Sequence, residues 1–423
     1  MTAALVLVLL ALYFGTPHTI DLPDGQERFR MLDALVLEGR LTDSRYSIVG
    51  PLFALPLYFL GLIWKSPEYW CARYNLLLVV LLVVALYRIL RSKLAPEALS
   101  GFLLALAATS MFPNHQTNFF GDTFTAVSVA IGIAAISTGR SGLGWPLLVL
   151  GGANAPASVL AVAAVAAAEG LSRRRWRYLA APLAVLAVTA TEAWLRRGSP
   201  FASGYQEGYQ VFQTMLPTSG RPGFSYPLLL GLLGILFSFG KGIFWFAPGL
   251  LVPSPSSEDP GVGRFRRLSY LFVAGLVPVY AMWWAWYGGW AWGPRFFLFA
   301  SVPASLAIAA AAARLDDRVW RRGGLLLAIL LSTWVGANGA VYGLRGLEFA
   351  AANGWRWEFL VWHVPEFTVL WHPLVASIPL STADIAVLAV IALSGALLAA
   401  PVAASLARTA AALPEVLRER IRR

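Results

Sequence analysis

Cysteine and charged residues are scarce in this chain of 423 residues, and each scarcity excludes a class of protein. The single cysteine, Cys71, excludes an internal disulfide framework and a metal site built from several cysteines. Only 13% of the residues are charged and 58% are hydrophobic, whereas soluble globular chains are about a quarter charged. A water-soluble protein of this length could not bury so much apolar surface, so soluble, disordered and fibrous classes are excluded.

Long apolar runs make up most of the chain. About 245 residues are apolar and a transmembrane helix needs about 20, so the composition suffices for roughly a dozen spans. We predict an all-α polytopic membrane protein with about 11–13 transmembrane helices, forming a single integral membrane domain over residues 1–423. No basic segment precedes the first run, so we expect a retained first membrane helix. The runs are 2–15, 49–64, 75–90, 95–112, 123–138, 144–169, 178–194, 227–252, 269–287, 296–313, 323–342 and 383–406.

The net charge of +11 comes largely from short basic loops between these runs. This distribution does not indicate nucleic-acid binding, because the positive-inside rule places basic loops at the cytoplasmic side of a membrane protein. The clusters lie at 88–93, 140, 173–177, 264–267, 314–322 and 408–423. Placing them inside puts three polar stretches outside, namely 16–48, 195–226 and the tryptophan-rich 343–382. We therefore predict a multi-pass protein of the cytoplasmic membrane whose active face is periplasmic or extracellular.

Two apolar runs carry residues that interrupt helices. Run 49–64 is short and contains two prolines, so we expect it not to be a full span. Run 144–169 has glycines, an asparagine and a proline at 151–156. That break predicts two half-helices, an arrangement tolerated where the backbone is buried or faces water.

The first polar stretch contains an amphipathic helical pattern that starts at Asp24. Phe29, Leu32 and Val36 share one face, and Gly39 predicts the end of the helix. A helix of this kind is expected to lie in the outer membrane interface. The stretch therefore predicts an interfacial helix directly after the first membrane helix.

Asp24 has two interpretations. It could be an N-cap that forms a capping box with Glu27. Its carboxylate, held at the membrane surface, could instead act as a general base toward a hydroxyl group. Asp21 is the competing candidate for that role, and we expect Glu27, Asp33 and Asp43 to be solvated.

The opening of the chain combines three elements in a recognisable order. They are Asp24-Gly25 after the first apolar run, Ala34-Leu35 with Glu38-Gly39 in the expected interfacial helix, and the proline-rich Pro51-Leu52-Phe53 with Pro56-Leu57-Tyr58. This order resembles the opening of the GT-C glycosyltransferases, which are polytopic enzymes that use polyprenyl-phosphate sugars.

Three later segments extend the resemblance to roughly residues 1–315. They are Arg197-Gly198-Ser199-Pro200 with Gly204-Tyr205 and Pro222-Gly223-Phe224; Gly231-Leu232-Leu233 with the stretch 240–248; and the stretch 284–296, which contains W-x-G-G-W-x-x-G-P-R. The second and third segments are similar to bacterial relatives of the dolichyl-phosphate-mannose–protein mannosyltransferases.

The resemblance implies a GT-C fold and an outward-facing active site with the first-loop aspartate as catalytic base. That role falls on Asp24, with Asp21 in reserve as a substrate-binding residue. The family often has two neighbouring acids at this place, whereas Gly25 follows Asp24 here, so the carboxylate pair is missing. Tyr205, in the second half of the resemblance, is a further candidate for substrate binding. We expect no obligatory cofactor, although a divalent cation is compatible with the family.

Three more polar residues have a physical case for a role. Asp122 could be the N-cap of run 123–138, or a second acid that contacts sugar hydroxyl groups or a cation. Lys241 lies inside an apolar run, where a lone charge costs at least about 2.5–3.5 kcal/mol, so it either binds a lipid phosphate or reaches the interface along its stem. Arg295 ends a glycine-rich aromatic turn, and its planar guanidinium either fits phosphate oxygens or lies at the interface.

Together these features predict an inverting glycosyltransferase. It would move a hexosyl or pentosyl group from a polyprenyl-phosphate donor to a hydroxyl group of a lipid, glycan or protein acceptor of the cell envelope. The alternative is a transporter or flippase for a lipid-linked saccharide, which an intramembrane lysine and a broken helix would also fit. Covalent transfer of the sugar separates the two.

Overall fold

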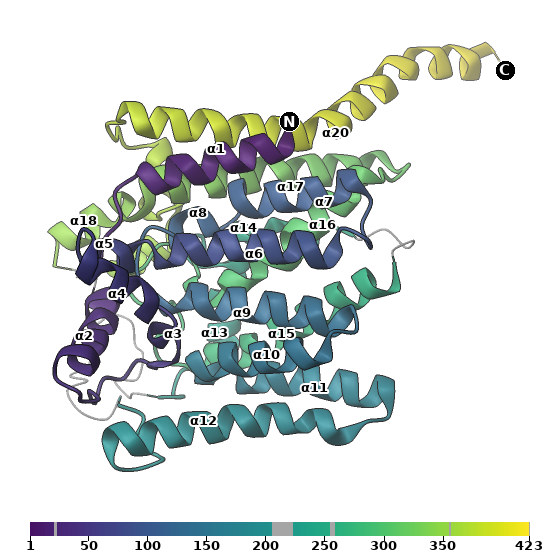
Figure 1. Ribbon diagram of the computed structural model, residues 1–423. Coiled ribbons are helices and arrows are strands. Elements are labelled where there is room, and N and C mark those ends of the chain that lie inside the picture. The colour runs from purple at the N-terminus through teal and green to yellow at the C-terminus, as the bar shows by residue number, and fades with distance from the viewer. Residues whose placement is uncertain (21–22, 205–222, 254–258, 355–356, 423) are drawn as a thin grey trace.

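Helices form the framework of the computed structural model, which describes residues 1–20, 23–204, 223–253, 259–354 and 357–422 (Figure 1). Within those ranges there is no strand beyond an isolated bridge between Thr19 and Asn118. The predicted all-α class is therefore confirmed.

The helices follow the apolar runs closely. In chain order the α-helices are α1 (Thr2–Gly15), α2 (Pro23–Leu37), α3 (Val49–Leu52), α4 (Leu55–Ile63), α5 (Pro67–Ala72), α6 (Tyr74–Leu90), α7 (Pro96–Ala108), α8 (Phe112–His115), α9 (Gly121–Ser137), α10 (Ser141–Asn154), α11 (Val159–Arg173), α12 (Ala180–Arg197), α13 (Leu228–Phe237), α14 (Ile243–Phe246), α15 (Pro260–Met282), α16 (Ser301–Ala313), α17 (Val319–Ala337), α18 (Glu348–Ala352), α19 (Glu358–His363) and α20 (Thr382–Arg422). Short 3₁₀ or π turns connect them: η1 (Pro156–Ser158), η2 (Trp176–Leu179), η3 (Pro248–Leu251), η4 (Arg295–Ala300), η5 (Asn338–Tyr342), η6 (Gly343–Leu347), η7 (Pro365–Phe367) and η8 (His372–Leu374).

The chain is an integral membrane protein by the length and composition of its helices. Four segments of the described chain are long and apolar enough to cross a membrane: Trp176–Arg197, Arg295–Ala313, Val319–Ala352 and Thr382–Ala412. Shorter apolar helices of 10–17 residues accompany them, namely Thr2–Gly15, Tyr74–Leu90, Pro96–Ala108, Gly121–Ser137 and Leu228–Phe237. The expected total of about 11–13 spans stays a prediction.

The bundle has two chemically different ends. The long helices lie roughly side by side, and α2, α3, α4 and α5 gather at one end (Figure 1). At the other end the basic loops meet: Lys93 Nζ lies 3.7 Å from Asp259 Oδ2, and Arg173 Nε lies 3.4 Å from Glu169 Oε2. Arg264 also pairs with Glu169. Contacts at this end therefore join the segments that carry three of the basic clusters, 88–93, 173–177 and 264–267.

The proline-rich run 49–64 is interrupted, as expected. It forms the short α3 and then the nine-residue α4, with Phe53 and Ala54 between them. A nine-residue helix is only about 14 Å long, which is too short to cross a hydrocarbon core of about 30 Å.

The break in run 144–169 is present, and the two helices that it separates, α10 and α11, run in opposite directions. Asn154, at the end of α10, donates from Nδ2 to the carbonyl oxygen of Gly121 in the first turn of α9, so α10 reaches the far end of its neighbour. The chain then returns through α11, because Trp145 near the start of α10 stacks on Tyr178 just after α11, with ring centroids 5.0 Å apart. The proline and glycines therefore make the turn of an antiparallel pair.

Candidate active site

The first-loop carboxylate turns inward from the interfacial helix. Because α2 begins at Pro23, a favoured first residue, Asp24 lies inside the first turn, and the prediction that it caps the helix is wrong. Its Oδ1 accepts a hydrogen bond from the Tyr46 hydroxyl, and its Oδ2 accepts one from Arg295 Nη1 at 2.5 Å. Both carboxylate oxygens are therefore held by side chains distant in sequence.

Arg295 reaches Asp24 from a turn that only glycine can form. Gly288, Gly289 and Gly293 have φ values of +77°, +73° and +61°, in the region that disfavours other residues. A Cβ on Gly288 would lie 3.1 Å from Arg295 Cγ, so the backbone wraps closely around the arginine stem. The Nε atom of Arg295 is buried and has no hydrogen-bond partner among the described residues. The guanidinium therefore has a donor to spare.

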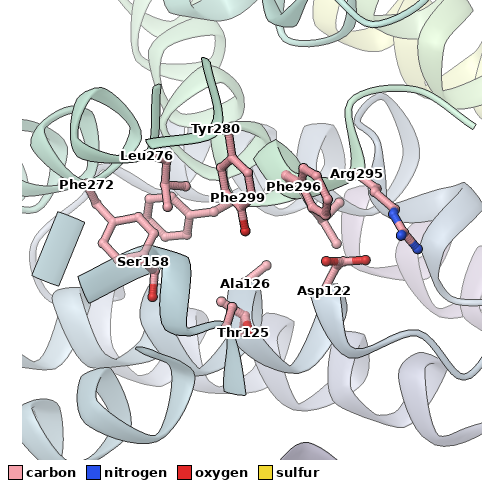
Figure 2. Close-up of a pocket in the computed structure, with 12 residues that line it drawn as sticks. Asp122, Thr125, Ala126, Ser158, Phe272, Leu276, Tyr280, Arg295, Phe296 and Phe299 are labelled. Carbon is pink, nitrogen blue, oxygen red and sulfur yellow. The ribbon is translucent and has the colours of Figure 1, made fainter. Parts of the chain in front are cut away.

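Asp122 and Arg295 line the same small cavity (Figure 2). Asp122 lies in the first turn of α9, and its carboxylate and the Arg295 guanidinium occupy one end of the cavity. The remainder is largely aromatic and apolar, lined by Phe272, Leu276, Tyr280, Phe296, Leu298 and Phe299 among others. The cavity thus joins a charged end, shared with the Asp24 pair, to an apolar body.

Lys241 is not part of this charged end. It lies in the turn between α13 and α14 and is 4% exposed. Its Nζ donates to the carbonyl oxygens of Gly289 at 3.2 Å, Ala291 at 2.5 Å and Gly293 at 3.1 Å. An ammonium has three donors, and these three carbonyl groups can use all of them. Lys241 therefore tethers the aromatic turn (residues 284–295) that carries Arg295, and its contact with a lipid phosphate stays a prediction.

Two residues of the site escaped the sequence analysis. Tyr46 donates to Asp24 and accepts a hydrogen bond from Arg45 Nη2 at 2.9 Å. Arg28 and Arg45 each place Cζ 4.9 Å from the centroid of the Tyr46 ring. The four-residue spacing from Asp24 to Arg28 puts both on one helix face and was a usable signal. Nothing in the sequence around Tyr46 distinguishes it from an ordinary interfacial tyrosine.

A buried arginine at the end of α12 fixes the loop that carries Tyr46. Arg196 donates to the carbonyl oxygens of Thr42 at 2.8 Å, Tyr46 at 2.7 Å and Ser44 at 2.9 Å, and it pairs with Glu192. Glu192 in turn accepts from the Ile48 amide at 2.8 Å. Arg196 therefore holds the loop that places Tyr46 beside Asp24.

The surroundings of Asp24 set its charge state. Burial alone would raise the pKa of the Asp24 carboxyl, but Arg295, Tyr46 and Arg28 together hold that pKa below its ordinary value. Burial raises the pKa of the Tyr46 hydroxyl, and the neighbouring Asp24 raises it further. The pair is therefore an ionised acceptor beside a protonated donor, which is the charge state a general base requires before it reacts.

Some predicted residues cannot be placed. Asp21 and Tyr205 lie outside the described residues. Among the residues that are described, no group of three or more His, Cys, Asp or Glu side chains comes together to hold a metal ion. Of the predicted site residues, the structure brings Asp24, Asp122 and Arg295 together.

Comparisons with known proteins give one structural likeness. No family model matches the sequence, and no curated protein matches it. The chain is similar to the crystal structure of ArnT from Cupriavidus metallidurans bound to undecaprenyl phosphate, with 16% identity and a TM-score of 0.48. The similarity covers 99% of this chain and 80% of that one. ArnT is a GT-C glycosyltransferase, the class that the sequence resembles; the likeness to mannosyltransferase relatives stays a prediction.

Proposed function

We propose that the protein is an inverting glycosyltransferase that takes a monosaccharide from a polyprenyl-phosphate donor. One observation carries the proposal: the Asp24 carboxylate of the interfacial helix is paired with Arg295 of the G-P-R turn, at 2.5 Å. The GT-C resemblance implies that Asp24 is the catalytic base. The planar guanidinium of Arg295 is suited to binding a phosphate group. Arg295 also lines the cavity that Asp122 lines.

In the proposed reaction, an acceptor hydroxyl oxygen attacks the anomeric carbon of the donor from the face opposite the phosphate. The bond from that carbon to the phosphate oxygen breaks, and its electron pair leaves with the polyprenyl phosphate. The hydroxyl proton passes to Asp24. The phosphate gains one negative charge as the bond breaks, and Arg295 offsets that charge, which lowers the barrier.

Arg295 has to exchange partners for this reaction to proceed. Without donor, its Nη1 is bound to Asp24 Oδ2. A donor phosphate competes for the same guanidinium and, by drawing it away, frees Oδ2 to receive the acceptor proton. The incoming negative charge also raises the basicity of Asp24, because a neighbouring like charge disfavours the ionised carboxylate. Donor binding therefore prepares the base.

The sugar is proposed to occupy the cavity beside Asp122. A carboxylate there can accept hydrogen bonds from sugar hydroxyl groups. The aromatic walls, in which Tyr280 and Phe296 stack with centroids 4.3 Å apart, offer flat apolar surfaces to the sugar ring. Asp21 and Tyr205 stay candidates for further substrate contacts. We place the reaction at the periplasmic or extracellular face, where the acceptor would be a lipid, glycan or protein of the envelope.

The transporter alternative has less support from Lys241 than the sequence suggested. Lys241 binds backbone carbonyl groups instead of standing free in the membrane, and the break at 151–156 is the turn between the antiparallel helices α10 and α11. The deciding experiment incubates the purified protein in sealed proteoliposomes with radiolabelled decaprenyl-phosphate sugars and membrane extract as acceptor. Label that becomes covalently bound to acceptor supports the proposal, whereas label that only crosses a vesicle membrane contradicts it.

A further inference from the structure

Arg28 is a buried cation that has no carboxylate partner among the described residues. It lies on α2, one helical turn after Asp24, and is 8% exposed. Acidic and basic residues at this spacing usually pair, yet Asp24 is bound to Arg295 and Tyr46. Among the described residues, no carboxylate oxygen lies within 4.0 Å of Arg28. Its recorded hydrogen bond runs from Nη1 to the Ser47 carbonyl oxygen at 3.2 Å, and its Nε is buried with no partner in the same described set.

The position of the Arg28 side chain is enforced from the opposite wall. A Cβ on Gly121 would lie 2.5 Å from Arg28 Cζ and 2.5 Å from Nη2, closer than atoms can approach. Only glycine at this place lets the guanidinium lie against the first turn of α9, directly before Asp122. Arg28 interacts electrostatically with both Asp24 and Asp122, and Arg295 interacts with the same two carboxylates. The two arginines therefore flank one pair of acids.

The two arginines each have a donor left over. Arg28 and Arg295 both have a buried Nε atom with no hydrogen-bond partner among the described residues. A buried donor that is left unpaired costs about 1–3 kcal/mol, so this arrangement favours a ligand that brings acceptor oxygens. A phosphodiester, the group that links sugar and polyprenyl chain in the proposed donor, offers such oxygens.

We infer that Arg28 is a second phosphate-binding residue, which holds the donor phosphate together with Arg295. This inference rests on the proposed function and adds to it a second arginine that binds the donor phosphate. The unpaired Nε of Arg28 and the unpaired Nε of Arg295 are the donors that would bind the phosphate oxygens. When the sugar leaves, the phosphate becomes a dianion, and two guanidinium groups stabilise it better than one.

The experiment measures binding of decaprenyl phosphate to the full chain in nanodiscs, with the uncharged alcohol decaprenol as a second probe. Hydrogen bonds to charged groups contribute about 1.5–3 kcal/mol, so Arg28→Gln is expected to weaken decaprenyl phosphate binding by about 10- to 150-fold. Decaprenol binding should stay unchanged. Arg28→Lys should recover part of the affinity, since lysine keeps the charge but not the planar fork.

Two matched variants separate binding from packing. Arg30→Gln removes an arginine from the same helix whose side chain is 69% exposed, and it should bind decaprenyl phosphate like the wild type. Gly121→Ala keeps every charge but displaces the Arg28 guanidinium, so it should lose affinity, and it replaces Arg28→Gln if that variant fails to fold.

The outcomes are distinguishable. Wild-type affinity in Arg28→Gln, or in Gly121→Ala, overturns the role of Arg28 and leaves the glycosyltransferase proposal standing. An equal loss of decaprenyl phosphate and decaprenol binding assigns Arg28 to packing and also overturns the inference. If the wild type binds no decaprenyl phosphate, the proposed donor class itself is wrong.

Discussion

At the scale of single residues, the site depends on a carboxylate that is ionised, buried and already paired. Asp24 and Arg295 are separated by 271 positions in the chain, and their side chains are only 16% and 13% exposed. Breaking one partner from such a pair leaves an uncompensated charge, which usually costs several kcal/mol. Substitutions here therefore have to be chosen so that a loss of activity is not a loss of the fold.

Asp24→Asn is the mildest such change, because asparagine has the same size and can still accept from Tyr46, although the charge of Arg295 then loses its partner. We expect sugar transfer to fall by about 10²- to 10⁴-fold, the usual contribution of a general base. Transfer of radiolabelled sugar is the measurement, with the elution volume and Tm confirming a folded protein. Glu27→Gln, one turn away with a half-buried side chain that pairs with the exposed Arg30, is the control and should retain activity. Full activity of Asp24→Asn would refute the assignment of the base.

Tyr46→Phe tests how the Asp24 charge is maintained. The hydroxyl group lowers the pKa of Asp24, so its removal should raise that pKa. The base works only when ionised, so the acidic limb of kcat/KM should move to higher pH in the variant, while the ring keeps its contacts with Arg28 and Arg45. Tyr58→Phe, which removes a hydrogen bond to Asp33 instead, should leave the limb in place. A limb that stays fixed or moves to lower pH in Tyr46→Phe would exclude this role.

The sequence predicted site residues well where a charged residue stands next to apolar runs. Asp24, Asp122 and Arg295 could be identified because each stands beside apolar runs, where a charge demands a reason. Lys241 satisfied the same criterion, but its partners are backbone carbonyl groups, and no sequence pattern distinguishes them from a phosphate. Tyr46 and Arg28 act through contacts made only when α2, the following loop and α9 pack together.

At the scale of elements, the aromatic turn is the piece that places Arg295, and Lys241 is its tether. Lys241→Met would remove the donors of three carbonyl groups. Each buried acceptor left unsatisfied costs about 1–3 kcal/mol, so we expect a lower Tm. We also expect a higher KM for the donor, because Arg295 would lose its fixed position.

The matched control for this tether is Lys93→Met at the opposite end of the bundle. Lys93 pairs with Asp259 at 3.7 Å and its side chain is 41% exposed, so its loss should change Tm and KM little. If Lys241→Met raised the donor KM without lowering Tm, direct phosphate binding by Lys241 would be the better explanation.

The ends of helices were predictable from the sequence where glycine and proline mark them. The direction that the chain takes after such an end was not predictable. Gly39, with φ of +65°, follows α2 closely, as its position after the amphipathic pattern predicted. The break at 151–156 was also visible, but whether the chain continues or reverses there depends on packing of α10 against α9. Sequence periodicity carries no information on that contact.

At the scale of the whole molecule, the basic loops and the candidate active site lie at opposite ends of the helix bundle. The basic loops meet through Lys93, Asp259, Glu169 and Arg264, whereas α2 and the site lie at the other end of the helices (Figure 1). The positive-inside rule assigns the basic end to the cytoplasm. A donor that enters sideways from the lipid and an acceptor of the envelope would then meet on the outer face.

Labelling in intact cells tests this orientation. In a Cys71→Ala background, Glu38→Cys lies at the end with the site and Ser92→Cys lies between α6 and α7 at the basic end; both positions are exposed. A membrane-impermeant maleimide should label Glu38→Cys in intact cells, because the site faces outward. Ser92→Cys should be labelled only after the membrane is permeabilised, which also shows that its thiol is reactive. The reverse pattern would place the Asp24–Arg295 pair in the cytoplasm, where an envelope acceptor could not reach it.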